Sequence, residues 1–318
     1  MAHMVETMAY AGELPWHGLG VEVSNDLTPV QMMQKAGVDW KVVEAESFVH
    51  FNDTVIPTGM KSLVRETDGS VLTNVGSGWH PCQNEDAFNF FNDFILAGDM
   101  EMHTAGSLND GKVVWALAKV KESFEIFGED KVDSYLLFSN PHQYGKAIDV
   151  RFTPIRVVCN NTLTYSLQSA TKNGAKVNHS TAFNPETVKD TLGLASEKFA
   201  EYKEMAQFMG SKRVTAEGLI EFYSTVFPNT SRTKEQVAPK TYEDLSRNAQ
   251  LCYDALETQP GAEYAEGSWW SAFNSVTYVT DHVYGRNSNN RLHSQWFGQN
   301  AARKVTAANK AVEMAVAA

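Results

Sequence analysis

The sequence predicts an α+β fold, in which an antiparallel sheet of hairpins crossed by a helix is followed by a mainly helical C-terminal half. Two observations predict it. Before residue 184, short β-branched runs alternate with turn residues, as is typical of antiparallel strands. After Asn184-Pro185, apolar residues recur at helical spacing. We therefore expect an α+β body over residues 1–183 and a helical region over residues 184–318 packed on it, forming either two domains or one continuous domain.

Caps and turns define the first elements. Thr28-Pro29 before VQMMQKAG predicts a short helix with Thr28 as its N-cap. Asn52-Asp53 divides a β-branched run over residues 42–64 into a hairpin, and Thr67-Asp68-Gly69 leads into a strand over residues 71–75. A small β-meander is therefore expected to open the fold.

The middle of the chain predicts one helix, two strand pairs and a further helix. The run NEDAFNFFNDFILAG has phenylalanines at helical spacing and acids in its first turn. Asn109-Asp110-Gly111 is a strong hairpin signal. Strands are expected over residues 100–108, 112–120, 132–139 and 147–159, with a helix from about Asn160.

The C-terminal part predicts five helices and contains no internal repeat. Their apolar residues recur with a period of about 3.6, which favours amphipathic helices. They are expected over residues 185–209, 215–226, 242–256, 268–282 and 294–315.

Composition excludes several classes of protein. The 318 residues are 43% hydrophobic and 20% charged, which indicates a folded chain with a proper core. No apolar run reaches the length of about 20 residues that a membrane helix needs, and the N-terminus has no signal-peptide pattern. The three cysteines, Cys82, Cys159 and Cys252, are scattered and odd in number, which favours buried thiols in a reducing cytoplasm.

Charge is unevenly distributed along the chain. The formal net charge is −11, and residues 1–131 hold 8 bases against 20 acids. Residues 140–180 instead hold five bases and one acid, and residues 286–310 hold five bases and no acid. Two basic islands therefore lie in an acidic chain, and on one face they would form an anion-binding groove.

Catalytic and metal motifs find little support. HExxH, GxxxxGK[ST] and GxSxG are absent, and His80-Pro81-Cys82 has no second pair at zinc spacing. A nucleophilic Cys159 is disfavoured because it ends an apolar strand, where burial raises a thiol pKa. Asp133 and Asp149 suggest a metal-dependent nuclease only weakly. We predict no cofactor and no metal, and regard an enzyme as the less favoured alternative.

Residues 140–168 carry the best functional signal. Arg151 and Arg156 interrupt an apolar strand, where a charge needs a partner or a ligand. Asparagines, aromatics and lysines around them suit contacts with phosphates and unpaired bases. The alternative is that both arginines pair with acids of the N-terminal meander and that the asparagines cap a helix. The candidate nucleic-acid contacts are Lys146, Arg151, Phe152, Arg156, Asn160, Asn161, Tyr165, Lys172, Lys176, Arg286, Arg291, Arg303 and Lys304.

Three motifs in order resemble one known family. They are PWHGLG at residues 15–20, VRFTPIRVVCNNTL at residues 150–163, and WWSAFNSVTYVTDH followed by RLHSQWFGQNAARK near the C-terminus. Together they resemble a phage/plasmid-like family classified as a domain of unknown function, found in bacteriophages, prophages and conjugative plasmids. Its central hairpin–helix pattern is similar to the Rad/Redβ/Erf class of single-strand annealing proteins, which form rings and hold DNA along a basic groove. The acidity of this chain departs from a typical annealer.

The resemblance and the basic islands together predict a phage-type single-stranded DNA-binding and annealing protein that acts in recombination or replication without covalent catalysis. The resemblance implies that the protein is a homo-oligomer, that its partner is single-stranded DNA and that it acts in the cytoplasm of a bacterial host. Two alternatives stay open. One is a metal-dependent nuclease that uses Asp133 and Asp149, and the other is a phage accessory protein whose acidic N-terminal part binds a host protein.

Overall fold

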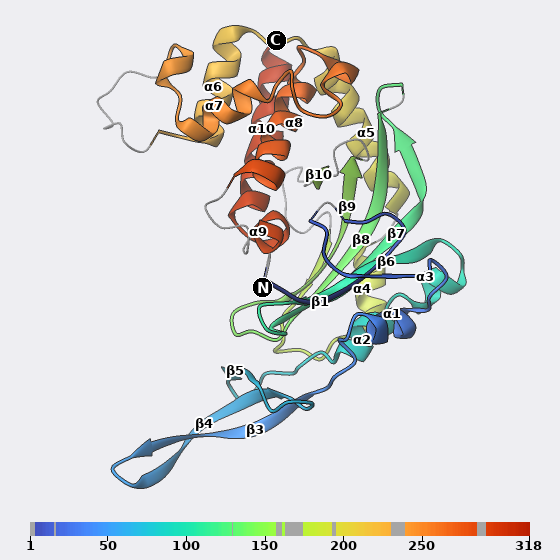
Figure 1. Ribbon diagram of the computed structural model, residues 1–318, viewed down its shortest axis with the longest axis vertical. Helices are drawn as coiled ribbons and strands as arrows, with labels where there is room; N and C mark the ends of the chain where they lie inside the picture. The colour runs from blue at the N-terminus through green and yellow to red at the C-terminus, as the bar shows by residue number, and fades with distance from the viewer. Residues whose placement is uncertain are drawn as a thin grey trace. The chain divides into compact units, whose positions relative to one another are not determined.

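The fold is mixed α+β, as the sequence predicts, with antiparallel sheets before the C-terminal helices (Figure 1). The computed structural model describes residues 4–15, 17–128, 130–156, 161–162, 174–192, 195–229, 239–284 and 291–318. The contacts of the chain form two compact units. The first unit comprises residues 1–121, 135–152 and 173–193, and the second comprises residues 122–134, 153–172 and 194–318.

The larger sheet has eight strands in the order β10-β9-β8-β7-β6-β1-β2, with β11 also paired to β9. The strand β1 is parallel to β2, whereas the pairs β1–β6, β6–β7, β9–β10 and β9–β11 are antiparallel. The hairpin predicted at Asn109-Asp110-Gly111 joins β6 to β7, and all three residues have positive φ. The bounds are β1 Val5–Ala11, β2 Val21–Val23, β6 Met100–Leu108, β7 Val113–Glu125, β8 Lys131–Pro141, β9 Ile148–Arg156, β10 Asn161–Thr162 and β11 Gly174–Val177.

Short helices cover part of the first unit. The helix α1 (Pro29–Lys35) has the predicted cap, because Thr28 Oγ1 accepts from the Gln31 N–H and the Gln31 side chain accepts from the Thr28 N–H. The single helix predicted from NEDAFNFFNDFILAG is two, α2 (Asn84–Asn89) and α3 (Asn92–Leu96). The helix α4 (Pro185–Leu192) contacts β11.

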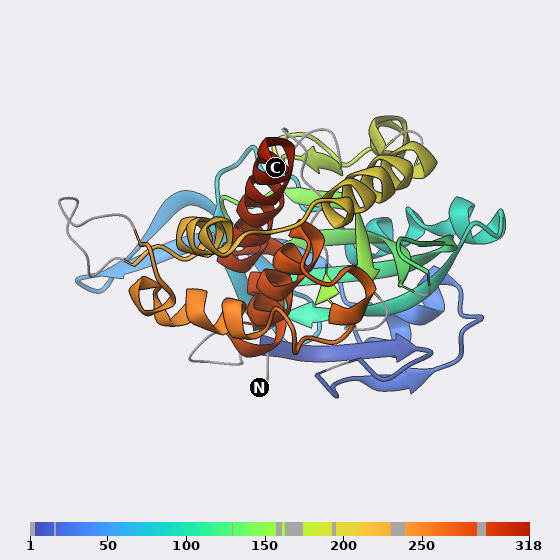
Figure 2. The same cartoon turned by 90° about the horizontal axis from the view of Figure 1, so that it is seen from above.

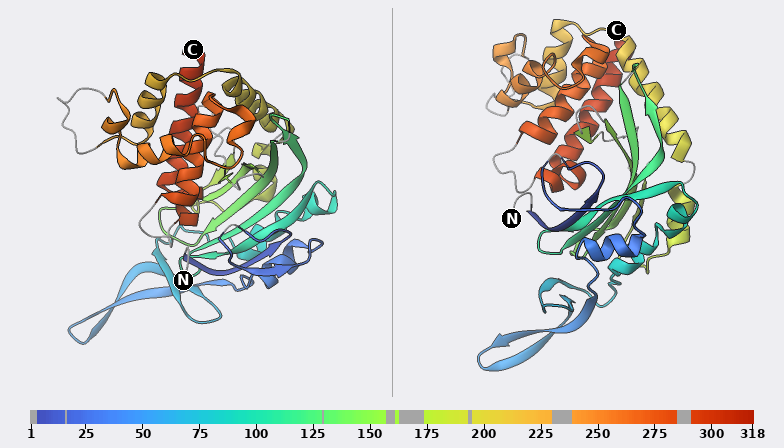
Figure 3. Two further views of the ribbon diagram at one scale, coloured as in Figure 1. Left: turned by 45° about the horizontal axis from the view of Figure 1, so that its top comes forward. Right: turned by 45° about the vertical axis from the view of Figure 1, so that its right-hand side comes forward.

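A second sheet of three strands, β3-β4-β5, also belongs to the first unit. The strands are β3 (Val42–Phe51), β4 (Thr54–Arg65) and β5 (Val71–Val75), as the β-meander prediction requires. The turn between β3 and β4 has φ values of 45° and 59° at Asn52 and Asp53, which suit a tight hairpin. Figure 3 shows this hairpin extending away from the strands β1 and β6 of the same unit in both views.

Helices dominate the second unit and pack around α8, whose residues 269–277 are all buried (Figure 2). A helix that is buried on every side belongs at the centre of a bundle. The helices are α5 (Ala195–Ser211), α6 (Ala216–Val226), α7 (Arg247–Asp254), α8 (Trp269–Tyr278), α9 (Arg291–Phe297) and α10 (Gln299–Ala317), with short 3₁₀ turns at Tyr242–Asp244 and Ala262–Ala265 and the π-helical segment η4 at Val279–Val283.

Several predicted boundaries are wrong. The helix expected from Asn160 is absent at residues 161–162, which form β10 because the outer edge of β9 offers free backbone groups there. The helix expected over residues 185–209 is two helices, α4 and α5. The helix expected over residues 294–315 divides at Gly298, where an added Cβ would lie 2.9 Å from the Ser294 Cα. No helix in the described ranges is long and apolar enough to cross a membrane.

Candidate nucleic-acid interface

The charged face of β9 and β11 is the best supported part of the predicted interface. Alternation places Asp149 and Arg151 on one face of β9, and the register places Lys176 of β11 opposite Asp149. The other face carries buried apolar residues, including Ile148 and Val150. A strand that packs its apolar residues on one face places its polar residues on the other, so the sequence pattern itself puts these charges on one face.

Arg151 has a partner, but a different one from that expected. Its Nη2 donates to Asp149 Oδ2 at 2.7 Å, and both side chains are largely buried. The structure thus gives Arg151 a partner in its own strand, while the side chain of Arg156 lies outside the described residues. Gly174 stands opposite Arg151, and a Cβ there would lie 2.8 Å from the Arg151 Cβ. Glycine at this position leaves the space that Arg151 occupies.

Lys146 and Lys176 are exposed and have no ion-pair partner within the described ranges. Lys176 of β11 lies opposite Asp149 and so shares a face with Arg151 of β9, whereas Lys146 lies in the turn that precedes β9. We call these three cations the basic strip. Of the predicted contacts, these three lie on or next to the β9–β11 pair.

Three loops that are distant in the sequence meet beside the basic strip. The Trp79 ring stacks on His179 with 4.1 Å between ring centroids and 11° between planes, and the His80 N–H donates to the His179 carbonyl at 2.6 Å. The turn after β8 reaches β5, where the Tyr144 N–H donates to Thr73 Oγ1. We call residues 76–80, 143–146 and 178–181 the loop cluster.

The loop cluster presents ring faces together with cations. Tyr144 is 69% exposed and lies two residues from Lys146. The Trp79 Nε1–H has no hydrogen-bond partner among the described residues. Ring faces beside unpartnered ammonium groups are the combination that binds bases and phosphates of a single strand.

A buried network of polar side chains, Asn84, Asn140 and His142, lies next to the loop cluster in the sequence and links its flanking segments. The Asn84 Nδ2 donates to the carbonyls of Val38 and Trp40, at 3.0 and 3.3 Å. Its Oδ1 therefore faces the His142 Nε2 at 2.9 Å and accepts a hydrogen bond from the Nε2–H. Asn140 Nδ2 donates to the Cys82 carbonyl. Burial, with the nearby His179 and Arg65, lowers the pKa of His142 to about 3, so this ring stays neutral at ordinary pH.

The second basic island is largely internal to the second unit. Lys304 is wholly buried, and its Nζ lies 2.9 Å from Oδ1 of Asp281, which is 1% exposed. The prediction that Lys304 contacts phosphate is wrong, because a side chain with no exposed surface cannot reach one. Arg303 lies over the rings of Tyr284 and Phe227, at 4.8 and 5.3 Å from the two centroids.

The same island organises the π-helical segment η4. A π turn leaves main-chain carbonyls outside the regular helical ladder. Three side chains donate to them: Asn300 to Thr280 O at 2.8 Å, Gln295 to Asp281 O at 2.6 Å and Arg291 to His282 O at 2.8 Å. Together with the Lys304–Asp281 pair we call these contacts the η4 clasp. The two C-terminal sequence motifs are thus brought together for packing.

The remaining predicted contacts are less informative. Phe152 is half-buried, and alternation along β9 places it on the face opposite Arg151. The backbones of Arg156 and Asn161 lie in β9 and β10. Asn160, Tyr165, Lys172, Arg286 and the thiol of Cys159 lie outside the described residues.

The nuclease alternative depends on Asp133 and Asp149 holding a metal ion. Asp149 is engaged by Arg151, and no group of three or more His, Cys, Asp or Glu side chains among the described residues could hold a metal ion. Cys82 and Cys252 are buried free thiols, as expected, and burial raises the pKa of each above the ordinary value.

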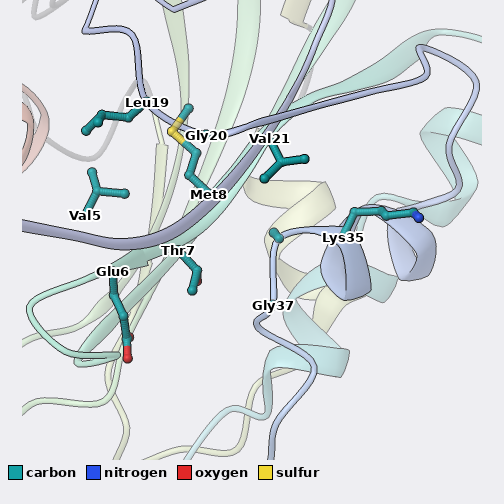
Figure 4. A pocket seen from close by; sticks show the side chains of 10 residues that line it. Val5, Glu6, Thr7, Met8, Leu19, Gly20, Val21, Lys35 and Gly37 are labelled. Atoms are coloured by element: carbon teal, nitrogen blue, oxygen red, sulfur yellow. The ribbon is translucent and has the colours of Figure 1, made fainter.

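A hollow of about 490 Å³ lies beside β1 (Figure 4). Its lining is mainly apolar, and the only ionisable side chains lining it are Glu6 and Lys35. Glu6 is held by Arg65, whose Nη1 lies 2.7 Å from Oε1. The Lys35 side chain extends away from Met8 and Leu19 in Figure 4. These features do not suit a phosphate site.

Sequence reasoning missed the aromatic part of the site. Trp79, His80 and His179 were not among the predicted contacts, because His179 lies 99 residues after His80 and only the fold joins them. The signal that could have found them is Gly76-Ser77-Gly78-Trp79-His80, where exposed glycines precede an aromatic residue. An added Cβ at either glycine would meet no atom within 4 Å.

Comparison with known proteins identifies the family and no individual relative. Neither the curated proteins nor the solved structures gave a match. Residues 71–312 match the sequence pattern of a domain of unknown function, DUF932. This range includes the loop cluster, the basic strip and the η4 clasp, and it begins after the β3–β4 hairpin. Because the match covers well over half of the chain, the protein belongs to the DUF932 family.

Proposed function

We propose that this protein binds single-stranded DNA at the loop cluster and the basic strip, as a non-catalytic binding or annealing protein of phage or plasmid type. One observation carries the proposal. Two exposed lysines have no carboxylate partner in the described ranges: Lys146, two residues from the exposed ring of Tyr144, and Lys176, on the strand β11 that pairs with β9. Lysines neutralise phosphates without reading sequence, and an aromatic ring stacks on any base.

The physical arrangement favours a single strand over a duplex. A ring 69% exposed at a turn can stack only on a base whose face is free. The binding surface holds three cations, few enough that affinity depends on stacking as well as charge. The resemblance to phage and plasmid proteins and to annealing proteins of the Rad/Redβ/Erf class supports the same reading.

The test is binding of a fluorescently labelled oligonucleotide, measured by anisotropy at low salt. Tyr144→Ala is expected to weaken binding by about 5- to 150-fold, the range that corresponds to one lost base stack. Lys146→Ala with Lys176→Ala is expected to weaken it further. Each substituted side chain is exposed, so the fold should persist.

Lys41→Ala and Lys121→Ala serve as matched controls, because both lysines are exposed in the first unit but lie outside the loop cluster. They should bind as tightly as the unsubstituted protein. Absence of binding by the unsubstituted protein at low salt would refute the proposal, and equal losses in controls and site variants would remove the loop cluster from it.

A further inference from the structure

The distal half of the β3–β4 hairpin is a two-stranded ribbon that the rest of its unit does not cover. The strand β5 pairs with β4 only over residues 61–64, so residues 47–60 pair only with each other among the described residues. We call residues 47–60 the ribbon. An isolated pair of strands is at best marginally stable in water, so a third strand is needed to make it rigid.

Both faces of the ribbon are apolar. Val49 pairs with Ile56 and shares its face with Phe51, while Phe48 and Val55 lie on the other face. All five side chains are between 44% and 63% exposed. Large apolar side chains are thus exposed on both faces of the same pair of strands, and an apolar surface that the rest of its unit leaves uncovered is typical of an interaction surface.

The two edges of the ribbon differ in their protection against pairing. Along β4, Pro57 cannot donate a hydrogen bond, and a bulge at Gly59 with φ of 71° interrupts the strand. The outer edge of β3 has no proline, glycine or lysine between Ser47 and Phe51. It is also the last strand of its sheet in the described part of the chain. Unprotected edges of this kind pair with other strands.

We propose that the outer edge of β3 pairs antiparallel with the same edge of a second copy of this chain, joining two ribbons into a four-stranded sheet. Side-chain complementarity supports both the occupant and the register. With Phe48 opposite Phe48 of the second copy, Glu46 of each chain lies opposite His50 of the other, and the ring N–H of His50 is a donor for that carboxylate. The contact is therefore self-complementary about a two-fold axis, as a homodimer requires.

The ribbon is also the place where two acidic copies can approach each other. The chain carries a net charge of −11, yet Asp53 is the only formal charge between residues 47 and 60. The ribbon has no lysine or arginine to neutralise phosphates, which favours a protein partner over nucleic acid. The ribbon thus offers the expected self-association a surface that does not depend on DNA binding.

The first experiment measures the mass of the full chain in solution without DNA, by sedimentation across a range of micromolar concentrations. The unsubstituted protein should form a dimer, and Phe48→Glu should be monomeric. Leu96→Glu is the matched control, since Leu96 is an exposed leucine of the same unit outside the ribbon, and it should remain dimeric. A monomer at every concentration would overturn the proposal, as would equal loss of the dimer in both variants.

The second experiment tests the register. Phe48→Cys should form an intermolecular disulfide, because directly opposed residues have Cα atoms about 4.5–5.5 Å apart. Val43→Cys is the control and should not form an intermolecular disulfide, because the proposed register separates the two copies of residue 43 by about 30 Å. Equal cross-linking of both variants would overturn the pairing.

Position 50 provides a charge test in the same register. His50→Lys should tighten the dimer, because it places a cation opposite Glu46 of the other copy. His50→Glu should weaken the dimer about 5- to 30-fold, because it places a carboxylate opposite Glu46 at both symmetry-related contacts. Equal effects of the two substitutions would exclude the Glu46–His50 contact. Co-flotation of the unsubstituted protein with neutral phosphatidylcholine vesicles, in the absence of a dimer, would assign the ribbon to a lipid surface and overturn the proposal.

Discussion

Lys304 illustrates how a single residue changes meaning between sequence and structure. In the sequence it belongs to a run of five bases without an acid, which favours a phosphate-binding role. In the fold its partner is Asp281, which lies 23 positions earlier and is equally buried. Linear charge counting could not find this pair, because the helical bundle alone brings the two side chains together.

Lys304→Met is expected to destabilise the second unit by about 3–5 kcal/mol, because the Asp281 carboxylate would stay buried without its cation. Lys310→Met on the same helix is the matched control. Lys310 pairs with the exposed side chains of Glu221 and Glu313, and its loss should cost no more than about 1 kcal/mol. Urea unfolding followed by tryptophan fluorescence measures both, and equally small losses would contradict the structural role of the pair.

His142 makes a prediction about pH. Its pKa is lowered to about 3 in the fold, first by burial and then by His179 and Arg65, whereas an unfolded histidine titrates near 6.5. Between these values the unfolded chain binds a proton that the folded chain does not. Stability therefore falls as pH falls from about 6.5 towards 3, by about 1.4 kcal/mol per pH unit.

The His142 effect can be isolated by comparing two pH values in two proteins. Between pH 7.5 and 5, the free energy of unfolding should fall by about 2 kcal/mol less in His142→Gln than in the unsubstituted protein. Glutamine keeps a donor for the Asn84 oxygen and removes the titrating ring. Identical changes with pH in the two proteins would show that His142 is not held neutral.

At the scale of elements, local sequence signals predicted which helices, strands and turns exist better than they predicted where each one begins and ends. The Thr28 cap, the Asn52-Asp53 turn and the Asn109-Asp110-Gly111 hairpin are confirmed, because each depends on side chains close in sequence. Breaks within helical patterns were missed. For example, the predicted helix over residues 242–256 begins with a separate 3₁₀ turn, and Ser246 caps the later α7.

Tertiary hydrogen bonding explains the elements that the sequence could not predict. The π-helical segment η4 depends on donors from Asn300, Gln295 and Arg291, which lie in other helices. The strand at residues 161–162 depends on the open edge of β9. The candidate site shows the same division: Lys146, Arg151 and Lys176 were predicted from one stretch, whereas the Trp79–His179 stack required the fold.

At the scale of the whole molecule, net charge and local surface act in opposite directions. The acidic chain would repel a polyanion, while the basic strip would attract one over a short range. The proposed binding of single-stranded DNA must therefore depend on few phosphate contacts. The sequence alone predicted nine cations in contact with DNA, and three of them make up the basic strip on and next to the β9–β11 pair.

The salt dependence of binding distinguishes an interface of three cations, the basic strip, from one of all nine predicted cations. Three phosphate contacts to a single strand predict a slope of about −2 for the logarithm of the binding constant against the logarithm of salt concentration, whereas nine predict about −6. Lys146→Ala should reduce the steepness by about 0.7, and Tyr144→Ala should lower affinity without changing the slope, because stacking releases no counterions. A slope near −6, unaffected by Lys146→Ala, would place the DNA elsewhere on the molecule, beyond the basic strip and the loop cluster.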